Sequence, residues 1–163
     1  MSVQQDYAEA IEWHRKIADG GDAVAQFTIG KLYETGEGVE EDCAEAVKWY
    51  RKAADQCNAF AQTSLGILYE NGMGVQQDYA EAAKWFRKAA DQGDAVAQTS
   101  LGFMHLSGRG VPQDYVRAHM WFNLAAAQDY AIALRTRYLT SKEMTAEQIA
   151  EAQLRAWEWE LKK

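Results

Sequence analysis

Apolar residues recur along the chain at intervals of three and four residues, the spacing of one face of an α-helix. In one segment they are Ala46, Trp49, Tyr50 and Ala53, and most residues between them are charged or polar. No run of four or more residues alternates apolar and polar positions between turn signals, as a half-buried strand would. A single proline, Pro112, leaves long helices uninterrupted. The pattern predicts an all-α fold.

The pattern repeats every 36 residues. Three copies align without a gap, at residues 4–39, 40–75 and 76–111. The third copy is identical to the first at 22 of 36 positions. A fourth stretch, 112–147, keeps the first half of the unit but has Arg137 and Tyr138 where the others have Ile-Gly or Leu-Gly. A fixed period of this length is typical of a solenoid, in which each unit buries its apolar face against its neighbours.

Each unit is expected to hold two helices. One begins after an aspartate with a glutamate three residues later, which is the pattern of an N-cap with an acid in the first turn; the pairs are Asp6/Glu9, Asp42/Glu45 and Asp78/Glu81. The other begins after Asp22, Asn58 or Asp94 and ends at a Gly-x-Gly-Val loop, where glycine tolerates a positive φ.

A glycine also lies inside that second type of helix, at positions 30, 66 and 102. Glycine in a helix interior costs roughly 1 kcal/mol relative to alanine. Its return in each copy therefore indicates close packing. We expect a neighbouring backbone to approach these glycines too closely for a β-carbon.

A tryptophan occupies the same position of every unit, at residues 13, 49, 85, 121 and 157. In the central copies it follows, by three residues, a small alanine that lets paired helices approach. We therefore expect these tryptophans in the core, and not in a stripe that stacks on sugars or bases. Trp159 lies about 200° around the helix from Trp157, so both cannot face the stack. Trp159 either closes over the end of the array or contacts a partner.

Composition excludes several kinds of partner. The chain has 17 Lys+Arg and 24 Asp+Glu, a net charge of -7 and a pI near 5.0, so nucleic acid and anionic membranes are disfavoured. No stretch approaches the roughly 20 apolar residues of a membrane span, and the start lacks a signal-peptide pattern. We expect no nucleic acid partner and no membrane insertion. The compartment stays open: cytoplasmic if the chain is complete, periplasmic or secreted if a signal peptide was removed.

The titratable residues form no recognisable catalytic or metal-binding pattern. The three histidines, His14, His105 and His119, are scattered, and none has another histidine four residues later. His105 replaces a tyrosine of the other copies, so we expect it to pack in the core, whereas His119 is expected at a solvent or interface position. No catalytic residue, metal site or cofactor is predicted, and the chain is expected not to be an enzyme.

Two runs of residues resemble the Sel1-like repeat (SLR), a relative of the tetratricopeptide repeat. They are Leu65-Gly66-x-x-Tyr69-x-x-Gly72-x-Gly74-Val75 and Asp78-x-x-x-Ala82-x-x-Trp85-x-x-Lys88-Ala89-Ala90. The resemblance covers residues 4–127 closely, and residues 144–152 resemble the capping helix of many bacterial members. It implies a right-handed superhelix of helix pairs, with the Leu-Gly helices lining a concave face.

In the phase of that family the chain, 1–163, is one array. Its parts are an orphan second helix at 6–18, repeats at 22–54, 58–90 and 94–127, and a degenerate repeat with a C-terminal cap at 130–163. The resemblance implies a scaffold for protein–protein interactions, since most members are interaction modules.

A few cysteine-rich members of the family have been linked to β-lactam binding, and they pair cysteines at a fixed spacing within each repeat. Here Cys43 and Cys57 replace a tyrosine and a glycine of the other copies. On a helix they would lie about 20 Å apart, too far for a disulfide. A β-lactam-binding protein or hydrolase therefore stays the alternative that the sequence supports less.

The resemblance also implies a candidate peptide-binding face, because fixed positions of each Leu-Gly helix point inward in the tetratricopeptide analogy. The residues expected there are Phe27, Lys31, Glu34, Phe60, Thr63, Ile67, Glu70, Asn71, Thr99, Phe103 and Leu106. Contiguous exposed apolar residues usually mark a contact surface. Either these residues bind a protein or peptide partner, or they fill a tight superhelix interior. A related alternative is self-association through the uncovered helix at 6–18, so that the chain is a monomer or a weak homodimer.

Overall fold

The computed structural model describes residues 3–162, and within that range the regular elements are all α-helices. The all-α prediction is therefore confirmed. The helices group into two compact units, Met1–Asp78 and Tyr79–Lys163. No helix among the described residues is long and apolar enough to cross a membrane.

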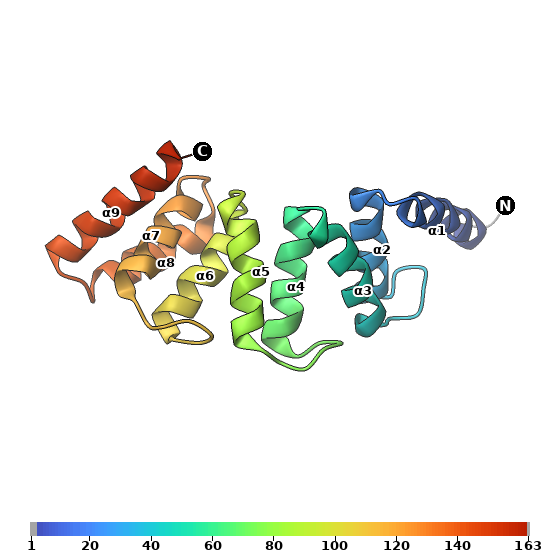
Figure 1. Cartoon of the computed structure of the whole chain (residues 1–163), viewed down its shortest axis with the longest axis horizontal. Coiled ribbons are helices and arrows are strands. Elements are labelled where there is room, and N and C mark those ends of the chain that lie inside the picture. Colours follow the sequence, from blue (N-terminus) through green and yellow to red (C-terminus); the bar gives the residue numbers. More distant parts are fainter. Residues whose placement is uncertain (1–2, 163) are drawn as a thin grey trace. The chain divides into compact units, whose positions relative to one another are not determined.

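Among its described residues, the first unit contains the helices α1 (Val3–Asp19), α2 (Ala23–Thr35), α3 (Cys43–Asp55) and α4 (Ala59–Asn71) (Figure 1). Each packs against the next in the chain. Long loops with two positive-φ glycines follow α2 and α4, and short turns follow α1 and α3. Neighbours in sequence are therefore neighbours in space, as expected for a helical repeat.

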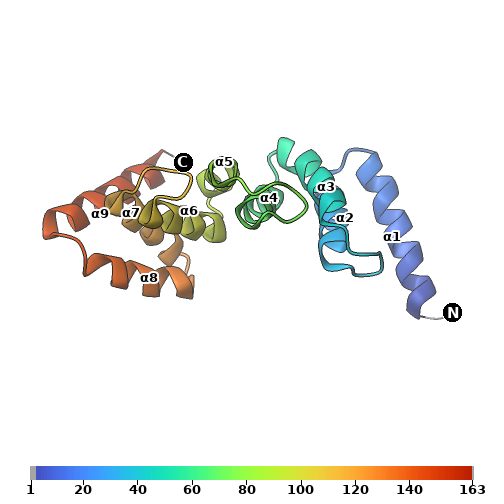
Figure 2. The ribbon, with the colours of Figure 1, turned by 90° about the horizontal axis from the view of Figure 1, so that it is seen from below.

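The second unit contains α5 (Tyr79–Asp91), α6 (Ala95–Ser107), α7 (Tyr115–Ala126), α8 (Ala131–Ser141) and α9 (Ala146–Leu161). The helices α5 to α8 again pack in chain order. The last helix differs, because α9 packs against α7. Figure 2 shows α8 and α9 diverging from the turn that joins them.

The helices that carry the Ile-Gly or Leu-Gly pair, α2, α4 and α6, are called the Leu-Gly helices, and their predicted N-caps are confirmed. The carboxylate of Asp22, the amide oxygen of Asn58 and the carboxylate of Asp94 accept hydrogen bonds of 2.7, 2.9 and 2.8 Å from backbone N–H groups three residues later. Thr145 and Gln148 form a capping box at the start of α9. These local bonds satisfy N–H groups that the first turn of a helix leaves free.

The caps of the other helices agree only in part. Asp42 accepts from the Glu45 backbone N–H at 2.9 Å, as predicted, but the Glu45 carboxylate pairs with Lys48 at 2.8 Å. The prediction that Asp6 caps the first helix is wrong, because α1 begins at Val3 and Asp6 lies within it.

The glycines inside the Leu-Gly helices face an aromatic ring, so the prediction of a close backbone is wrong for the two that the structure tests. A β-carbon on Gly30 would lie 2.6 Å from Cδ1 of Tyr50. One on Gly102 would lie 2.7 Å from both Cδ1 and Cζ of Phe122. Each glycine therefore leaves the space that the aromatic ring of the next helix fills, and we call this space the socket.

A neighbouring backbone does come close to a glycine elsewhere, in a Gly-x-Gly loop of each of the two compact units. A β-carbon on Gly74 would overlap the peptide that joins Cys43 to Ala44, and one on Gly110 would overlap the Tyr79 carbonyl. Both glycines also have positive φ, 67° and 69°. Only a residue without a side chain meets both conditions without strain.

The tryptophan that recurs every 36 residues is buried in the inner repeats, as predicted, but is exposed in the first and the last repeat. Trp49 and Trp85 are covered by the ammonium groups of Lys52 and Lys88, 3.9 and 4.1 Å from their ring centroids, and Trp121 is fully buried. Trp13 is 61% exposed and Trp157 is 58% exposed, so the prediction is wrong for both. Trp13 lies on a face of α1 that α2 does not cover, and α9 turns Trp157 outward by packing through Ala152 and Ala156.

Candidate functional site

Aromatic side chains of α2 and α4 form an exposed apolar surface in the first unit. The Phe27 ring centroid lies 5.6 Å from that of the buried Tyr50 and 5.9 Å from that of Phe60. Phe60 is 64% exposed. Ile67 lies two turns further along α4 and is half-buried. We call the surface formed by the predicted residues of these two helices the α2–α4 face.

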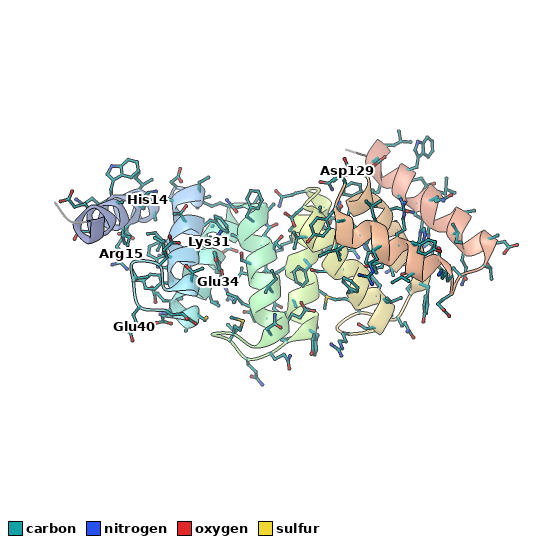
Figure 3. The ribbon with its side chains drawn as sticks, turned by 180° about the vertical axis from the view of Figure 1, so that it is seen from behind. His14, Arg15, Lys31, Glu34, Glu40 and Asp129 are labelled. Carbon is teal, nitrogen blue, oxygen red and sulfur yellow. The ribbon has the colours of Figure 1, made fainter. Side chains whose placement is uncertain are left out.

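Polar groups of α2 border this apolar surface. Lys31 is exposed and Glu34 is half-buried, and both lie on the same side of α2 (Figure 3). The Tyr50 hydroxyl donates a 2.5 Å hydrogen bond to the Glu34 carboxylate. Burial and this carboxylate raise the pKa of Tyr50, so its hydroxyl keeps its proton. Glu34 is thereby held in place by a core residue.

The predicted residues of α4 differ in what they present. Asn71 is exposed, and its amide donates to the Ile67 carbonyl at 2.8 Å. Glu70 is half-buried, and its backbone carbonyl accepts from Gln77 at 2.8 Å. Thr63 is only 7% exposed, so it offers almost no surface to a ligand and corresponds to the alternative in which these residues fill the interior of the helix stack.

The second unit presents a smaller set of the predicted residues, all on α6. Phe103 is partly exposed and packs edge to face against Phe122 at 5.4 Å. Leu106 is half-buried. Thr99 is buried and its hydroxyl donates to the Ala95 carbonyl of its own helix at 2.8 Å, so it also corresponds to the alternative of an interior position.

Two of the histidines are buried, one as predicted and one not. His105 packs in the core and donates from Nδ1 to the Pro112 carbonyl at 3.2 Å. The prediction of a solvent or interface position for His119 is wrong: the residue is 3% exposed, with Nδ1 3.2 Å from the Asn123 amide nitrogen. Burial lowers the pKa of both rings, and Arg137 lowers that of His119 further. The one sequence signal for the burial of His119 was that the fourth repeat departs from the pattern of the other three.

Trp159 is half-buried, with its ring centroid 6.1 Å from that of Trp121 and the planes at 74°. This contact corresponds to the alternative in which Trp159 closes over the end of the helix stack. A contact with a partner protein stays a prediction.

Chemistry based on metals or thiols has little support in the described residues. Within them no group of three His, Cys, Asp or Glu side chains could hold a metal ion. Cys43 is half-buried and Cys57 is exposed, and both are free thiols. Burial raises the pKa of Cys43, which leaves its thiol protonated.

The family model of the Sel1 repeat matches residues 1–22, 23–56, 59–94 and 95–130. No curated protein matches the chain. Among solved structures, a protective antigen of uropathogenic Escherichia coli strains with an SLR fold is 40% identical over 93% of this chain, with a TM-score of 0.86. A Sel1 repeat protein from Oxalobacter formigenes is 38% identical over 80% of this chain, with a TM-score of 0.75.

This chain spans 32% of the length of the first of those proteins and 54% of the second. A third structure, the cysteine-rich protein B of Helicobacter pylori, is 21% identical over 83% of this chain, with a TM-score of 0.65, and this chain spans 97% of it. At that identity the likeness shows a shared fold only.

Proposed function

Because the chain belongs to the Sel1 repeat family, whose members are typically protein-interaction modules, we propose that it is a non-enzymatic scaffold that binds a peptide segment of a partner protein on the α2–α4 face. The observation that carries the proposal is the Phe27–Phe60 pair. A phenylalanine that is 64% exposed beside a second aromatic ring is costly in water unless a partner covers it.

Charge at the edge of the face supports a peptide ligand with a fixed direction. Lys31 and Glu34 lie one helical turn apart and carry opposite charges, so they can bind donors and acceptors of an adjacent backbone or side chains of opposite charge. Because Tyr50 holds the Glu34 carboxylate in place, that group loses little conformational freedom on binding. Apolar contacts would supply affinity, and the two charges would set the orientation.

The test uses peptides selected by display against the wild-type chain, with dissociation constants measured by fluorescence anisotropy. Phe60→Asp should weaken binding at least about tenfold, because burying a phenylalanine contributes roughly 1.5–3 kcal/mol. Leu154→Asp on α9 is the matched control, since Leu154 is also an exposed apolar residue on a helix, but in the second unit. Circular dichroism should show unchanged helicity for both variants. Loss of binding in Leu154→Asp with none in Phe60→Asp would refute the proposal.

Self-association is a second candidate, favoured by the exposure of Trp13. The equivalent tryptophans Trp49 and Trp85 are buried, so a second copy that packs on α1 would give Trp13 the cover they have. Light scattering at micromolar concentration tests this alternative. A monomer, with the same mass for wild type and Trp13→Ala, removes it.

A further inference from the structure

A polar cavity of about 360 Å³ lies where α7, α8 and α9 meet. A second hollow of about 290 Å³ adjoins it and shares Asn123 of α7, Arg137 of α8 and Gln153 of α9. The two therefore form one groove over α7, bounded by α8 and α9, which we call the α7 groove. It lies entirely in the second unit and has no residue in common with the α2–α4 face.

The α7 groove exists because the repeat pattern breaks in α8. In α6 the Leu-Gly pair is fully packed: Leu101 is buried and Gly102 receives the Phe122 ring. In α8, Arg137 takes the position of the leucine and Tyr138 takes that of the glycine, so no space is left there for a ring of the next helix. The last helix, α9, packs on α7 instead, and space remains between α8 and α9.

Arg137 is a half-buried cation that no acidic side chain of the described residues pairs with directly. Within the side chains that the structure describes, it makes no hydrogen bond and no ion pair, and no acidic residue lines the first cavity. The one carboxylate along the groove, Glu160, lines the second hollow. A cation removed from water is costly unless it is paired, so this position favours an anion.

The groups around Arg137 are neutral and can donate hydrogen bonds. They are the amides of Asn123 and Gln153 and the ring of His119, whereas the Ser141 hydroxyl, which also lines the cavity, donates to the Tyr138 carbonyl at 2.8 Å. Burial and the positive charge of Arg137 lower the pKa of His119, so its ring is uncharged at neutral pH. Among the described residues that line the first cavity Arg137 is the one charged group, and the Lys142 ammonium lies over the Tyr138 ring, 4.5 Å from its centroid, so the charge around the cavity suits an anionic ligand. The fork of an arginine matches the two oxygens of a carboxylate.

We propose that the α7 groove is a binding site for a carboxylate ligand, whose two oxygens meet Arg137 and whose apolar body lies against Tyr138 and Ile149. The volume of the first cavity is that of a small-molecule site. The same chemistry is offered by a free organic acid and by an acidic side chain of a peptide. The proposal is independent of peptide binding on the α2–α4 face.

The test is a nuclear magnetic resonance titration of the full chain with sodium benzoate, up to about 20 mM at constant ionic strength. Saturable shifts are expected for His119 and for the amides of residues 137–141. The His119 ring should also titrate at a higher pH with benzoate bound, because an anion offsets the effect of Arg137. Glu160→Gln should tighten binding by removing a like charge. Benzamide, which has the same shape without the charge, should give no saturable shift.

Arg137→Gln should weaken benzoate binding at least about tenfold. Arg135→Gln is the matched control, because it removes the same charge from an exposed position of the same helix and should leave binding unchanged. Arg137→Leu restores the residue type of the repeat; it should abolish binding while the melting temperature stays the same or rises. This last variant separates loss of the ligand site from loss of the fold.

A blocked tripeptide with a central glutamate identifies the source of the carboxylate. Tighter binding of the tripeptide than of benzoate assigns the site to a peptide side chain, and the reverse assigns it to a free acid; either result supports the proposal. No saturable shift with either probe overturns it. Equal weakening by Arg135→Gln and Arg137→Gln, or equal binding of benzamide, overturns it as well.

Discussion

Gly102→Ala tests the socket that joins a Leu-Gly helix to the ring of the next helix. The new methyl group would lie 2.7 Å from two atoms of the Phe122 ring and closer still to Cε1, whereas ordinary contact lies at 3.4–4 Å. Phe122 is fully buried, so its ring has no room to retreat. The substitution should therefore destabilise the second unit.

The magnitude follows from two opposing effects. Overpacking a core costs typically 1–3 kcal/mol, and three overlapping ring atoms place this case near the top, at about 3 kcal/mol. Alanine regains about 1 kcal/mol of helix propensity over glycine. The expected net loss is about 2 kcal/mol in the free energy of unfolding, or roughly 4–8 °C in melting temperature.

Urea unfolding followed by circular dichroism measures the loss, and Phe122→Leu supplies the second background. Without the ring, Gly102→Ala should stabilise the chain by about 1 kcal/mol through helix propensity, so the double-mutant cycle should give a coupling of about 3 kcal/mol. An equal cost in both backgrounds would show that the glycine serves something other than the ring. A stabilised Gly102→Ala chain would refute the socket altogether.

Three further predictions concern stability. Trp85→Ala should cost about 3–5 kcal/mol by urea unfolding, whereas exposed Trp13→Ala should cost less than about 1 kcal/mol; similar costs would contradict the burial assignments. Cys57→Gly should raise the free energy of unfolding by about 1 kcal/mol, because Cys57 holds a φ of 64° at a position where other units have glycine, and no gain would mean that the turn is unstrained. Burial lowers the pKa of His105 and His119 in the folded chain, so the unfolded chain binds more protons below about pH 6.5. The free energy of unfolding should therefore fall as the pH drops from about 7.5 to about 5.5, by up to about 1.4 kcal/mol per pH unit for each histidine. Thermal melts of His105→Tyr should show a shallower slope, and an unchanged slope would refute this origin.

Much of the inner fold could be predicted because its causes are local. The caps at Asp22, Asn58 and Asp94 depend on a side chain and a backbone group three residues apart, and the chain order shows both. The repeat supplied the rest, since identical spacing in three copies implies that Trp49 and Trp85 meet the same surroundings.

The remaining features depend on which helix packs on which. The sequence indicated that a close neighbour excludes a side chain at Gly102, but only the packing of α6 on α7 identifies that neighbour as the Phe122 ring. Trp157 keeps the repeat phase and is still exposed, because α9 packs on α7 through its alanines. His119 is buried at the same junction, and no spacing in the sequence encodes it.

The candidate site was predicted unevenly for the same reason. The resemblance to the repeat family placed Phe27 and Phe60 on one face, and their rings do meet. It could not distinguish exposed positions from covered ones on that face, so it included Thr63. The α7 groove was not predicted at all, because a break in a repeat pattern does not reveal what the broken unit encloses.

Site-specific photo-crosslinking in cells tests the central claim most directly. A photoreactive benzoyl-phenylalanine is placed at Asn71 on the α2–α4 face, at Lys48 on α3 as an exposed control, and at Trp13 on α1. We predict an adduct with a different protein from position 71 and none from position 48. The claim is contradicted if positions 71 and 48 give the same adducts, or if position 71 gives none while position 13 links the chain to a second copy of itself.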